Sequence, residues 1–193
     1  MNSNGRSMEA TRGSKTNTRV ERDPLTRIVG EDQLEAQVVR LIADARKHGT
    51  LLSILLLDLC GLRMLNEVAG HRAGDQMVLE LTRVLHNEVE EPGLLCRIGG
   101  SEFLVVLKGC RSDAIILGQR LQREVGLFQI DVPPDRHASA SLSFGVAEFG
   151  VNGEELEDLL RVATMETLRS LAGLRRAETE WSFDEPLAMV ESH

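Results

Sequence analysis

The stretch that decides the fold is LLCRIGGSEFLVVL, residues 94–107. Two short apolar runs in it flank the segment Gly99-Gly100-Ser101-Glu102. Glycine tolerates positive φ, so this pattern predicts a β-hairpin whose turn carries one acidic residue, Glu102. Upstream, the apolar run 51–57 predicts a buried strand that ends at Asp58. If this strand lies beside the hairpin, Asp58 and Glu102 converge at one edge of the sheet.

Around these strands, apolar residues recur at helical spacing in four further segments. They predict helices over residues 31–47, from Gly74-Asp75 to about 89, after Ser112-Asp113, and from Asn152 to about 172. Strict alternation over residues 138–147 predicts a half-buried strand. The order helix, strand, helix, hairpin, helix, strand, helix indicates an α/β (α+β) domain, with a central mixed, mostly antiparallel sheet flanked by helices.

The chain of 193 residues has room for one domain with tails. Residues 1–22 are polar and almost free of apolar side chains, which predicts a flexible N-terminal arm. Residues 23–176 carry the apolar patterns and form the expected domain. Residues 177–193 hold five acids and no Lys or Arg, and are expected to be an acidic C-terminal tail in which Trp181 and Phe183 pack on the body or meet a partner.

Composition excludes several classes of function. The formal net charge of −8 and an aromatic content of 3% disfavour binding to nucleic acid, which needs positive charge and stacking rings. No apolar run reaches the length of about 18 residues that a membrane span needs, and no signal peptide precedes the domain, so we expect a cytoplasmic protein. Cys60, Cys96 and Cys110 lack zinc-ligand spacing and are expected to be reduced thiols.

The predicted sheet edge has residues that suit a nucleotide site. Two nearby carboxylates, Asp58 and Glu102, are what Mg²⁺ needs when substrate phosphates complete its shell. Asn66 and Asp75 lie nine positions apart around a glycine-rich turn and can both hydrogen-bond a planar heterocycle. Solvated loop acids and turn-capping residues remain the alternative for all four. His71 can titrate near neutrality or serve as a turn residue.

The ordered motifs resemble the GGDEF domain of bacterial diguanylate cyclases, which join two GTP molecules into cyclic di-GMP. Residues 23–26 are similar to the start of the family motif D-x-L-T-G-L-x-N-R, residues 58–75 to D-x-D-x-F-K-x-x-N-D-x-x-G-H-x-x-G-D, and residues 97–103 to R-x-G-G-D-E-F. Residues 141–147 resemble the family's S-x-G-x-A strand. The resemblance implies a palm-like sheet related to nucleotide cyclases and polymerases.

The resemblance also implies roles for single residues. Asp58 matches a metal ligand, Glu102 matches an acid close to the metals and to the reacting ribose hydroxyl, and Mg²⁺ is the implied cofactor when nucleotide is bound. Asn66 and Asp75 match the pair that reads guanine, and Arg63 matches a basic residue that contacts the triphosphate. The family's turn glycines, which let the backbone approach the nucleotide, are matched by Gly99 and Gly100.

The departures from the family pattern fall in the catalytic half of the site. Ser101 stands where the signature has an acid that ligates metal, and a neutral hydroxyl is a poor substitute. Further replacements are Cys60 for an Asp, Leu62 for Phe, Gly30-Glu31 for Asn-Arg, and Leu171 for a Lys near the phosphates. Residues 90–93 read Glu-Glu-Pro-Gly where feedback-inhibited members carry R-x-x-D, so we expect no cyclic di-GMP bound at that site.

Two hypotheses follow from the retained and the lost residues. The first is a degenerate GGDEF domain, inactive or impaired as a cyclase, that acts in cyclic di-GMP signalling through GTP or a protein partner. The alternative is an active diguanylate cyclase in which Asp58 and Glu102 hold the metals. Because cyclases work as two facing half-sites, pairing with a second copy or with another GGDEF protein is also expected.

Overall fold

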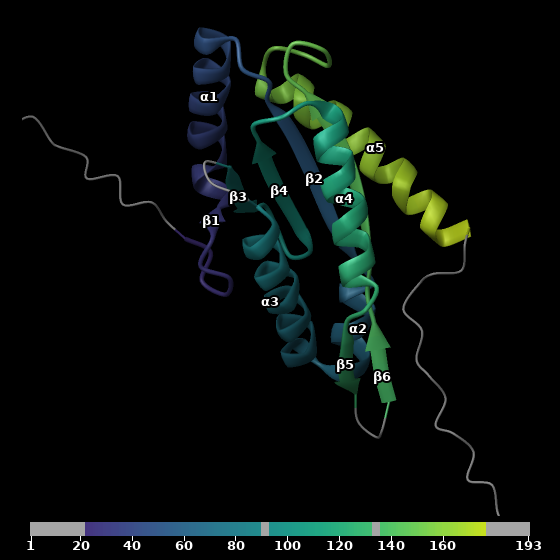
Figure 1. Ribbon diagram of the computed structural model, residues 1–193. Coiled ribbons are helices and arrows are strands. Elements are labelled where there is room, and N and C mark those ends of the chain that lie inside the picture. The colour runs from purple at the N-terminus through teal and green to yellow at the C-terminus, as the bar shows by residue number, and fades with distance from the viewer. Residues whose placement is uncertain (1–21, 90–92, 133–135, 177–193) are drawn as a thin grey trace, which may run out of the picture.

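The computed structural model describes residues 22–89, 93–132 and 136–176. Its centre is a five-stranded sheet with the order β1-β3-β4-β2-β7, in which β1 and β3 run parallel and the other neighbours run antiparallel (Figure 1). The mixed, mostly antiparallel sheet is therefore confirmed. The strands are β1 (Val29–Gly30), β2 (Ser53–Cys60), β3 (Leu94–Arg97), β4 (Glu102–Leu107), β5 (Gln129–Val132), β6 (Arg136–Ser139) and β7 (Ser141–Glu148).

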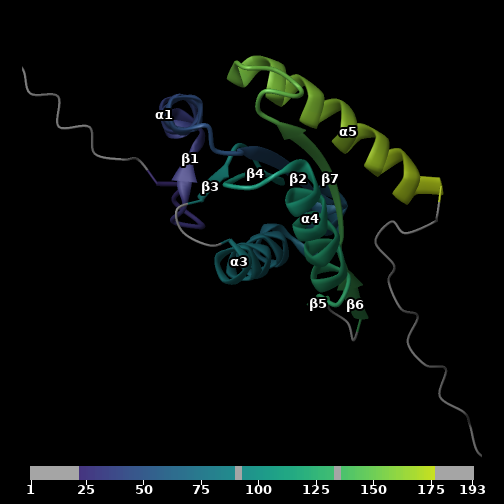
Figure 2. The ribbon, with the colours of Figure 1, turned by 45° about the horizontal axis from the view of Figure 1, so that its top comes forward.

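Helices cover both faces of the sheet, as the turned view shows (Figure 2). One layer holds α2, α3 and α4, whose buried side chains share a core with the sheet. The other layer holds α1 and α5 and encloses a second core. The helices are α1 (Glu31–His48), α2 (Leu62–Ala69), α3 (His71–Glu88), α4 (Arg111–Val125) and α5 (Leu156–Arg176).

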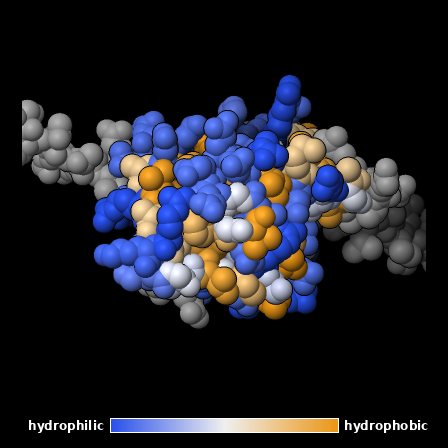
Figure 3. Space-filling model, turned by 90° about the horizontal axis from the view of Figure 1, so that it is seen from above, coloured by the Kyte–Doolittle hydropathy of each residue, from blue (hydrophilic) through white to orange (hydrophobic). Residues whose placement is uncertain are grey.

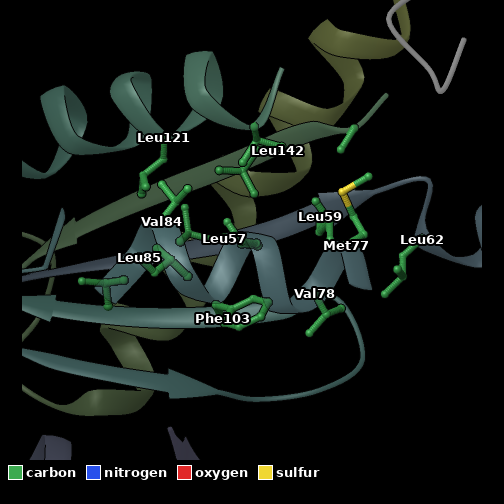
Figure 4. Close-up of a cluster of buried hydrophobic side chains, with 14 of the residues drawn as sticks. Leu57, Leu59, Leu62, Met77, Val78, Val84, Leu85, Phe103, Leu121 and Leu142 are labelled. Carbon is green, nitrogen blue, oxygen red and sulfur yellow. The ribbon is translucent and has the colours of Figure 1, made fainter. Parts of the chain in front are cut away.

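The strand β2 lies between β4 and β7 and feeds both cores. Leu55, Leu57 and Leu59 point into the core beneath α2, α3 and α4, while Ile54 and Leu56 point into the core beneath α1 and α5. Successive side chains of a strand alternate between faces, so a strand buried on both sides reads as one apolar run. Figure 4 shows the first of these cores, with Leu57 and Leu59 among its labelled residues.

The strand β2 was expected to end at Asp58 but extends two residues further, to Cys60, and this matters for the site. The strand continues through Asp58 to Cys60, because Asp58 pairs with β4 on one side and with β7 on the other. The helix expected from Gly74-Asp75 begins earlier, at His71, and a separate helix, α2, precedes it. Gly70 joins the two helices with a positive φ of 84°, which explains why a single helical pattern could not span both.

The strand expected over residues 138–147 is also corrected. The chain is broken at Ala140 into β6, which pairs with β5, and β7, which joins the main sheet. In β7 the small residues Ser143 and Gly145 are buried rather than exposed, because α5 packs against them. A Cβ added to Gly145 would lie 2.0 Å from the backbone oxygen of Ala163. The small residues on one face of β7 therefore reflect the close packing of α5 against that face.

Two helices begin at other residues than expected from Ser112-Asp113 and from Asn152. The helix α4 is capped by Cys110, whose backbone N–H donates to the Asp113 carboxylate at 2.9 Å. The carbonyl Oδ1 of Asn152 accepts a bond from the backbone N–H of Glu148 at 2.8 Å, so this side chain closes the turn after β7. The last helix begins four residues later, at Leu156.

Some expectations fall outside the described residues. Residues 1–21 of the expected N-terminal arm, the acidic tail and residues 90–92 of the feedback-site comparison belong there. Within the described parts of the chain, no helix is both long enough and apolar enough to cross a bilayer. Seen from above, hydrophobic side chains reach the surface in patches separated by hydrophilic ones (Figure 3).

Candidate functional site

The hairpin turn and the end of β2 lie side by side, as the sequence predicted. In the β2–β4 pairing, Asp58 stands directly opposite Glu102. The backbone N–H of Leu59 donates to the carbonyl of Ser101 at 3.0 Å, and that of Ile98 donates to the carbonyl of Glu102 at 3.0 Å. Backbone hydrogen bonds therefore bring Asp58, Ser101 and Glu102 together at one end of the sheet.

The side chain of Ser101 is bound to the carboxylate beside it. Its hydroxyl donates to Oδ1 of Asp58 at 2.7 Å. A hydroxyl that donates to a carboxylate satisfies one of its acceptor positions without adding negative charge. Ser101 thus supports the orientation of Asp58 and contributes no anionic ligand of its own.

Asp58 and Glu102 have no basic partner within the part of the chain that the structure describes. Burial raises the pKa of Glu102 above its ordinary value, and the negative charges of Asp58 and Glu31 raise it further. Within residues 22–89, 93–132 and 136–176, no salt bridge joins Asp58 or Glu102 to a basic side chain. The cluster therefore carries uncompensated negative charge, an arrangement that is common at sites that bind a ligand or a cation.

The residues present do not fit the pair of Mg²⁺ ions that two-metal phosphoryl transfer uses. Such a centre needs several anionic oxygens to hold two cations. Here Asp58 and Glu102 are the available carboxylates, Asp58 is already bound by the Ser101 hydroxyl, and Cys60 is a buried thiol. In the described part of the chain, no group of three potential metal-ligating side chains is found.

A second carboxylate lies on the other side of the turn and is fully compensated. The guanidinium of Arg97 donates to Asp23 at 3.1 Å and also to the carbonyls of Gly99 and Gly100, at 3.0 and 2.8 Å. Burial acts to raise the pKa of Asp23, but hydrogen bonds from Thr26 and Arg97 outweigh it and hold that pKa below its ordinary value. Arg97 and Asp23 therefore fix the shape of the glycine turn.

A cleft of about 450 Å³ lies on the Ser101 side of the turn. Of the residues expected to bind nucleotide, it contains Arg63, Asn66 and Gly100. The Arg63 side chain is 93% exposed, and its Nε donates to Oε1 of Glu67 at 3.0 Å. The cleft is lined by Leu62, Arg63, Asn66, Glu67, His71, Gly100 and Ser101.

The amide of Asn66 has an unmet hydrogen-bonding capacity. Its Oδ1 is buried and has no hydrogen-bond partner among the residues that the structure describes. The amide packs against Gly74 of α3, where an added Cβ would lie 1.9 Å from Oδ1. A buried polar atom without a partner costs about 1–3 kcal/mol. Gly74 was missed as a site residue, although a glycine inside a helical pattern was a usable signal.

The remaining expected residues lie outside this cleft. Asp75 follows Gly74 on α3 and is exposed, but its side chain does not line the cleft. Gly99 lines a different cleft of about 460 Å³ on the Asp23 side of the turn, which Gly100 shares. Asp58 and Glu102 lie at the boundary between strand and turn and line neither cleft. Glu31 lines the Asp23-side cleft, and its negative charge raises the pKa of Glu102. The sequence had singled out Glu31 only as a replacement of a family residue.

Comparison with known proteins agrees with the arrangement of these elements. The family model for the diguanylate cyclase GGDEF domain matches residues 20–172. Diguanylate cyclase DosC of Escherichia coli is 28% identical over 143 residues, which cover 73% of this chain and 31% of DosC. Cyclic di-GMP phosphodiesterase PdeB of Shewanella oneidensis is 31% identical over 140 residues, covering 69% of this chain and 16% of PdeB. The chain thus spans less than a third of these relatives.

Solved structures share the fold. A sensory box/GGDEF family protein from Caulobacter crescentus superimposes with a TM-score of 0.72 at 26% identity, covering 79% of this chain and 99% of that one. Diguanylate cyclase SiaD of Pseudomonas aeruginosa, solved with its activator SiaC, gives a TM-score of 0.71 at 27% identity. The match covers 79% of this chain and 58% of the SiaD chain. With the family match over four fifths of its length and this shared fold, the chain belongs to the GGDEF-domain family of cyclic di-GMP signalling.

Proposed function

We propose that this chain is a degenerate GGDEF domain with little or no diguanylate cyclase activity, which acts in cyclic di-GMP signalling through binding. The observation that carries the proposal is the hydrogen bond from Ser101 to Asp58 at 2.7 Å. It places a neutral hydroxyl where the family has a metal-ligating acid. Two-metal phosphoryl transfer stabilises both the attacking and the leaving oxygen, so the loss of an anionic ligand impairs the chemical step more than it impairs binding.

Guanine nucleotide is the proposed small-molecule ligand, with GTP as the form that the family uses. The cleft, the unpartnered Asn66 amide and the close approach of Gly74 support recognition of a planar base with donors and acceptors on its edge. Arg63 is the basic side chain that lines this cleft, and its Nε is bound to Glu67. Any Mg²⁺ that arrives with the nucleotide has Asp58 and Glu102 as its protein carboxylates.

Protein partners form the second part of the proposal. The relative SiaD was solved with its activator SiaC, which shows that a GGDEF protein can be controlled by another chain. A degenerate domain that keeps the fold can pair with a copy of itself or with an active GGDEF protein in the cytoplasm. We propose no cyclic di-GMP binding at the feedback position, because residues 90–93 lack the basic residue of that motif.

A cyclase assay tests the proposal directly. Purified protein is incubated with GTP and either Mg²⁺ or Mn²⁺, and cyclic di-GMP is quantified by chromatography. We expect product at no more than the level of an Asp58→Ala variant. Turnover well above that variant would overturn the degenerate reading. Calorimetry with GTP tests the binding part, for which heat that falls in Asn66→Ala is the expected result.

The alternative is an active diguanylate cyclase, and one observation favours it. Asp58 and Glu102 stand opposite each other in the strand register, so two carboxylates remain at the place where metals bind in the family. The Ser101→Asp variant separates the two readings. A gain of activity in this variant shows that only the ligand at position 101 is missing, whereas activity already present in the unmodified chain supports the alternative.

A further inference from the structure

The cleft beside the glycine turn offers little free positive charge to a phosphate chain. Among its lining residues, Arg63 is the one with a permanent positive charge, and it is both exposed and paired with Glu67. Solvation and pairing leave such a guanidinium little net attraction for another anion. The nearby Arg97 uses its donors on Asp23 and on the carbonyls of the turn, so it is not available either.

Negative charge, by contrast, gathers at the adjoining strand end. Asp58 and Glu102 oppose each other across β2 and β4, and the charge of Glu31 at the start of α1 also acts on Glu102. A divalent cation would mask this charge, but the neutral Ser101 hydroxyl replaces an anionic ligand and already binds Asp58. A phosphate chain that extends from the cleft toward the strand end therefore meets repulsion with little metal to offset it.

The base-recognising end of the cleft does not depend on that charge. Asn66 lines the cleft from α2 and packs against Gly74 of α3, whereas Asp58 and Glu102 do not line this cleft. An Asn amide offers both a donor and an acceptor, and a half-turn about its last bond exchanges them without changing its packing. Hydrogen bonds from this amide to a guanine edge would require neither phosphate nor metal.

From these contrasts we propose that the site selects guanine through the base alone, without a divalent cation, and that added phosphates weaken binding. The preferred ligand class is then the guanine nucleoside, and the triphosphate binds less tightly. This inference rests on the proposed binding of guanine nucleotides and specifies which member of that class is favoured. It also sets the site apart from one in which a metal-bound triphosphate supplies most of the affinity.

Equilibrium calorimetry of the full chain tests the inference. Guanosine, GMP and GTP are titrated separately, first with a chelator and then with Mg²⁺, at low and at high salt. We expect GTP to bind about fivefold or more weakly than guanosine at low salt. Because salt screens repulsion, GTP affinity is expected to rise with salt while guanosine affinity stays constant. Addition of Mg²⁺ is expected to change GTP affinity by less than about twofold.

Two matched variants locate the cause. Glu31→Gln removes a charge that acts on Glu102, whereas Asp32→Asn removes the neighbouring charge of the same helix turn. We expect the ratio of GTP to guanosine affinity to rise in the first variant and to stay constant in the second. Gly74→Ala places a methyl group against the Asn66 amide, and all three ligands are expected to lose affinity while the thermal transition is retained.

The outcomes are distinguishable. Tighter binding of GTP with Mg²⁺ than of guanosine overturns the inference and leaves the proposed function standing. Absence of binding by all three guanine ligands overturns the nucleotide part of the proposed function and the inference with it. Equal changes in Glu31→Gln and Asp32→Asn contradict the assignment of the repulsion to the strand-end carboxylates.

Discussion

Two carboxylate clusters flank the same glycine turn, and they differ in what surrounds them. On one side, Asp23 accepts bonds from Thr26 and Arg97, and its pKa is held low. On the other side, Asp58 and Glu102 face each other with the Ser101 hydroxyl as their polar neighbour, and the pKa of Glu102 is raised by burial and by nearby acids. Asp23 has the Arg97 guanidinium as its cationic partner, whereas Asp58 and Glu102 have no basic partner among the described residues.

The difference separates an architectural role from a binding role. A carboxylate whose partners are supplied by the chain stabilises the folded state, whereas carboxylates left to repel each other make the folded state less stable. Such destabilising repulsion is typical of binding sites, where a ligand or a cation compensates the charge. The comparison predicts that substitutions in the two clusters act on stability with opposite signs.

Removal of Asp23 is expected to have the largest effect. Its loss leaves the Arg97 guanidinium, only 12% exposed, without its anionic partner and frees the turn. We expect Asp23→Ala to lower the free energy of unfolding by about 2–3 kcal/mol. Urea denaturation measures this change. The exposed acid Glu35 serves as the control, since Glu35→Ala should stay within about 0.5 kcal/mol of the unmodified chain. A similar loss in both variants would contradict the structural role of Asp23.

The sequence predicted much of this arrangement because it is encoded locally. The apolar run that ends near Asp58 and the two glycines of the turn predicted that Asp58 and Glu102 would meet, and the β2–β4 register confirms it. Helical spacing predicted α1 within one residue of its observed end. The strand end, the glycine turn and the helix depend on residues near in sequence, whereas the meeting of Asp58 and Glu102 was expected only if the strand lay beside the hairpin.

Features that depend on contacts between distant residues could not be predicted from local sequence patterns. The role of Arg97 requires Asp23 to lie beside it, although the two are 74 residues apart in the chain. The burial of Ser143 and Gly145 in β7 depends on the packing of α5 against them, so the alternating pattern was interpreted as a half-buried strand. The distribution of the expected site residues between two clefts likewise depends on distant segments, since α2 lies against the turn on one side and the start of α1 lies against it on the other.

The compensated side also contains a strained backbone, which offers the next test. Arg27 is the one residue other than glycine with positive φ in the described ranges, at 64°, and its N–H donates to the carbonyl of Asp23. A side chain in this conformation costs about 1 kcal/mol. Arg27→Gly is therefore expected to raise the unfolding free energy by about that amount. Arg27→Ala keeps the Cβ and should bring no such gain, so an equal rise in both variants would exclude strain as the cause.

On the uncompensated side, neutralising Glu102 is expected to stabilise the fold slightly. Glu102→Gln removes the repulsion with Asp58 and Glu31 and retains the shape of the side chain. Solvent screens an exposed carboxylate, so the expected gain is about 0.5 kcal/mol near neutral pH. Denaturation of this variant beside Glu35→Gln measures it. A loss of stability would show that Glu102 has a stabilising partner.

The pH dependence provides the finest distinction between the clusters. The pKa of Glu102 is raised above its ordinary value of 4.5 in the folded state, so its ionisation destabilises the fold at neutral pH, and that penalty disappears as pH falls through the raised value toward 4.5. The pKa of Asp23 is lowered below 3.8, so its stabilisation is complete above that value and is lost as pH falls through the lowered one.

The stability difference between Glu102→Gln and the unmodified chain should therefore shrink on mild acidification, while the deficit of an Asp23→Asn variant stays constant over the same range and closes only at lower pH. Urea midpoints measured from roughly pH 8 to pH 3 resolve the two windows. If both differences shrink in the same window, the two carboxylates share one electrostatic environment, and the division of the turn into an architectural side and a binding side fails.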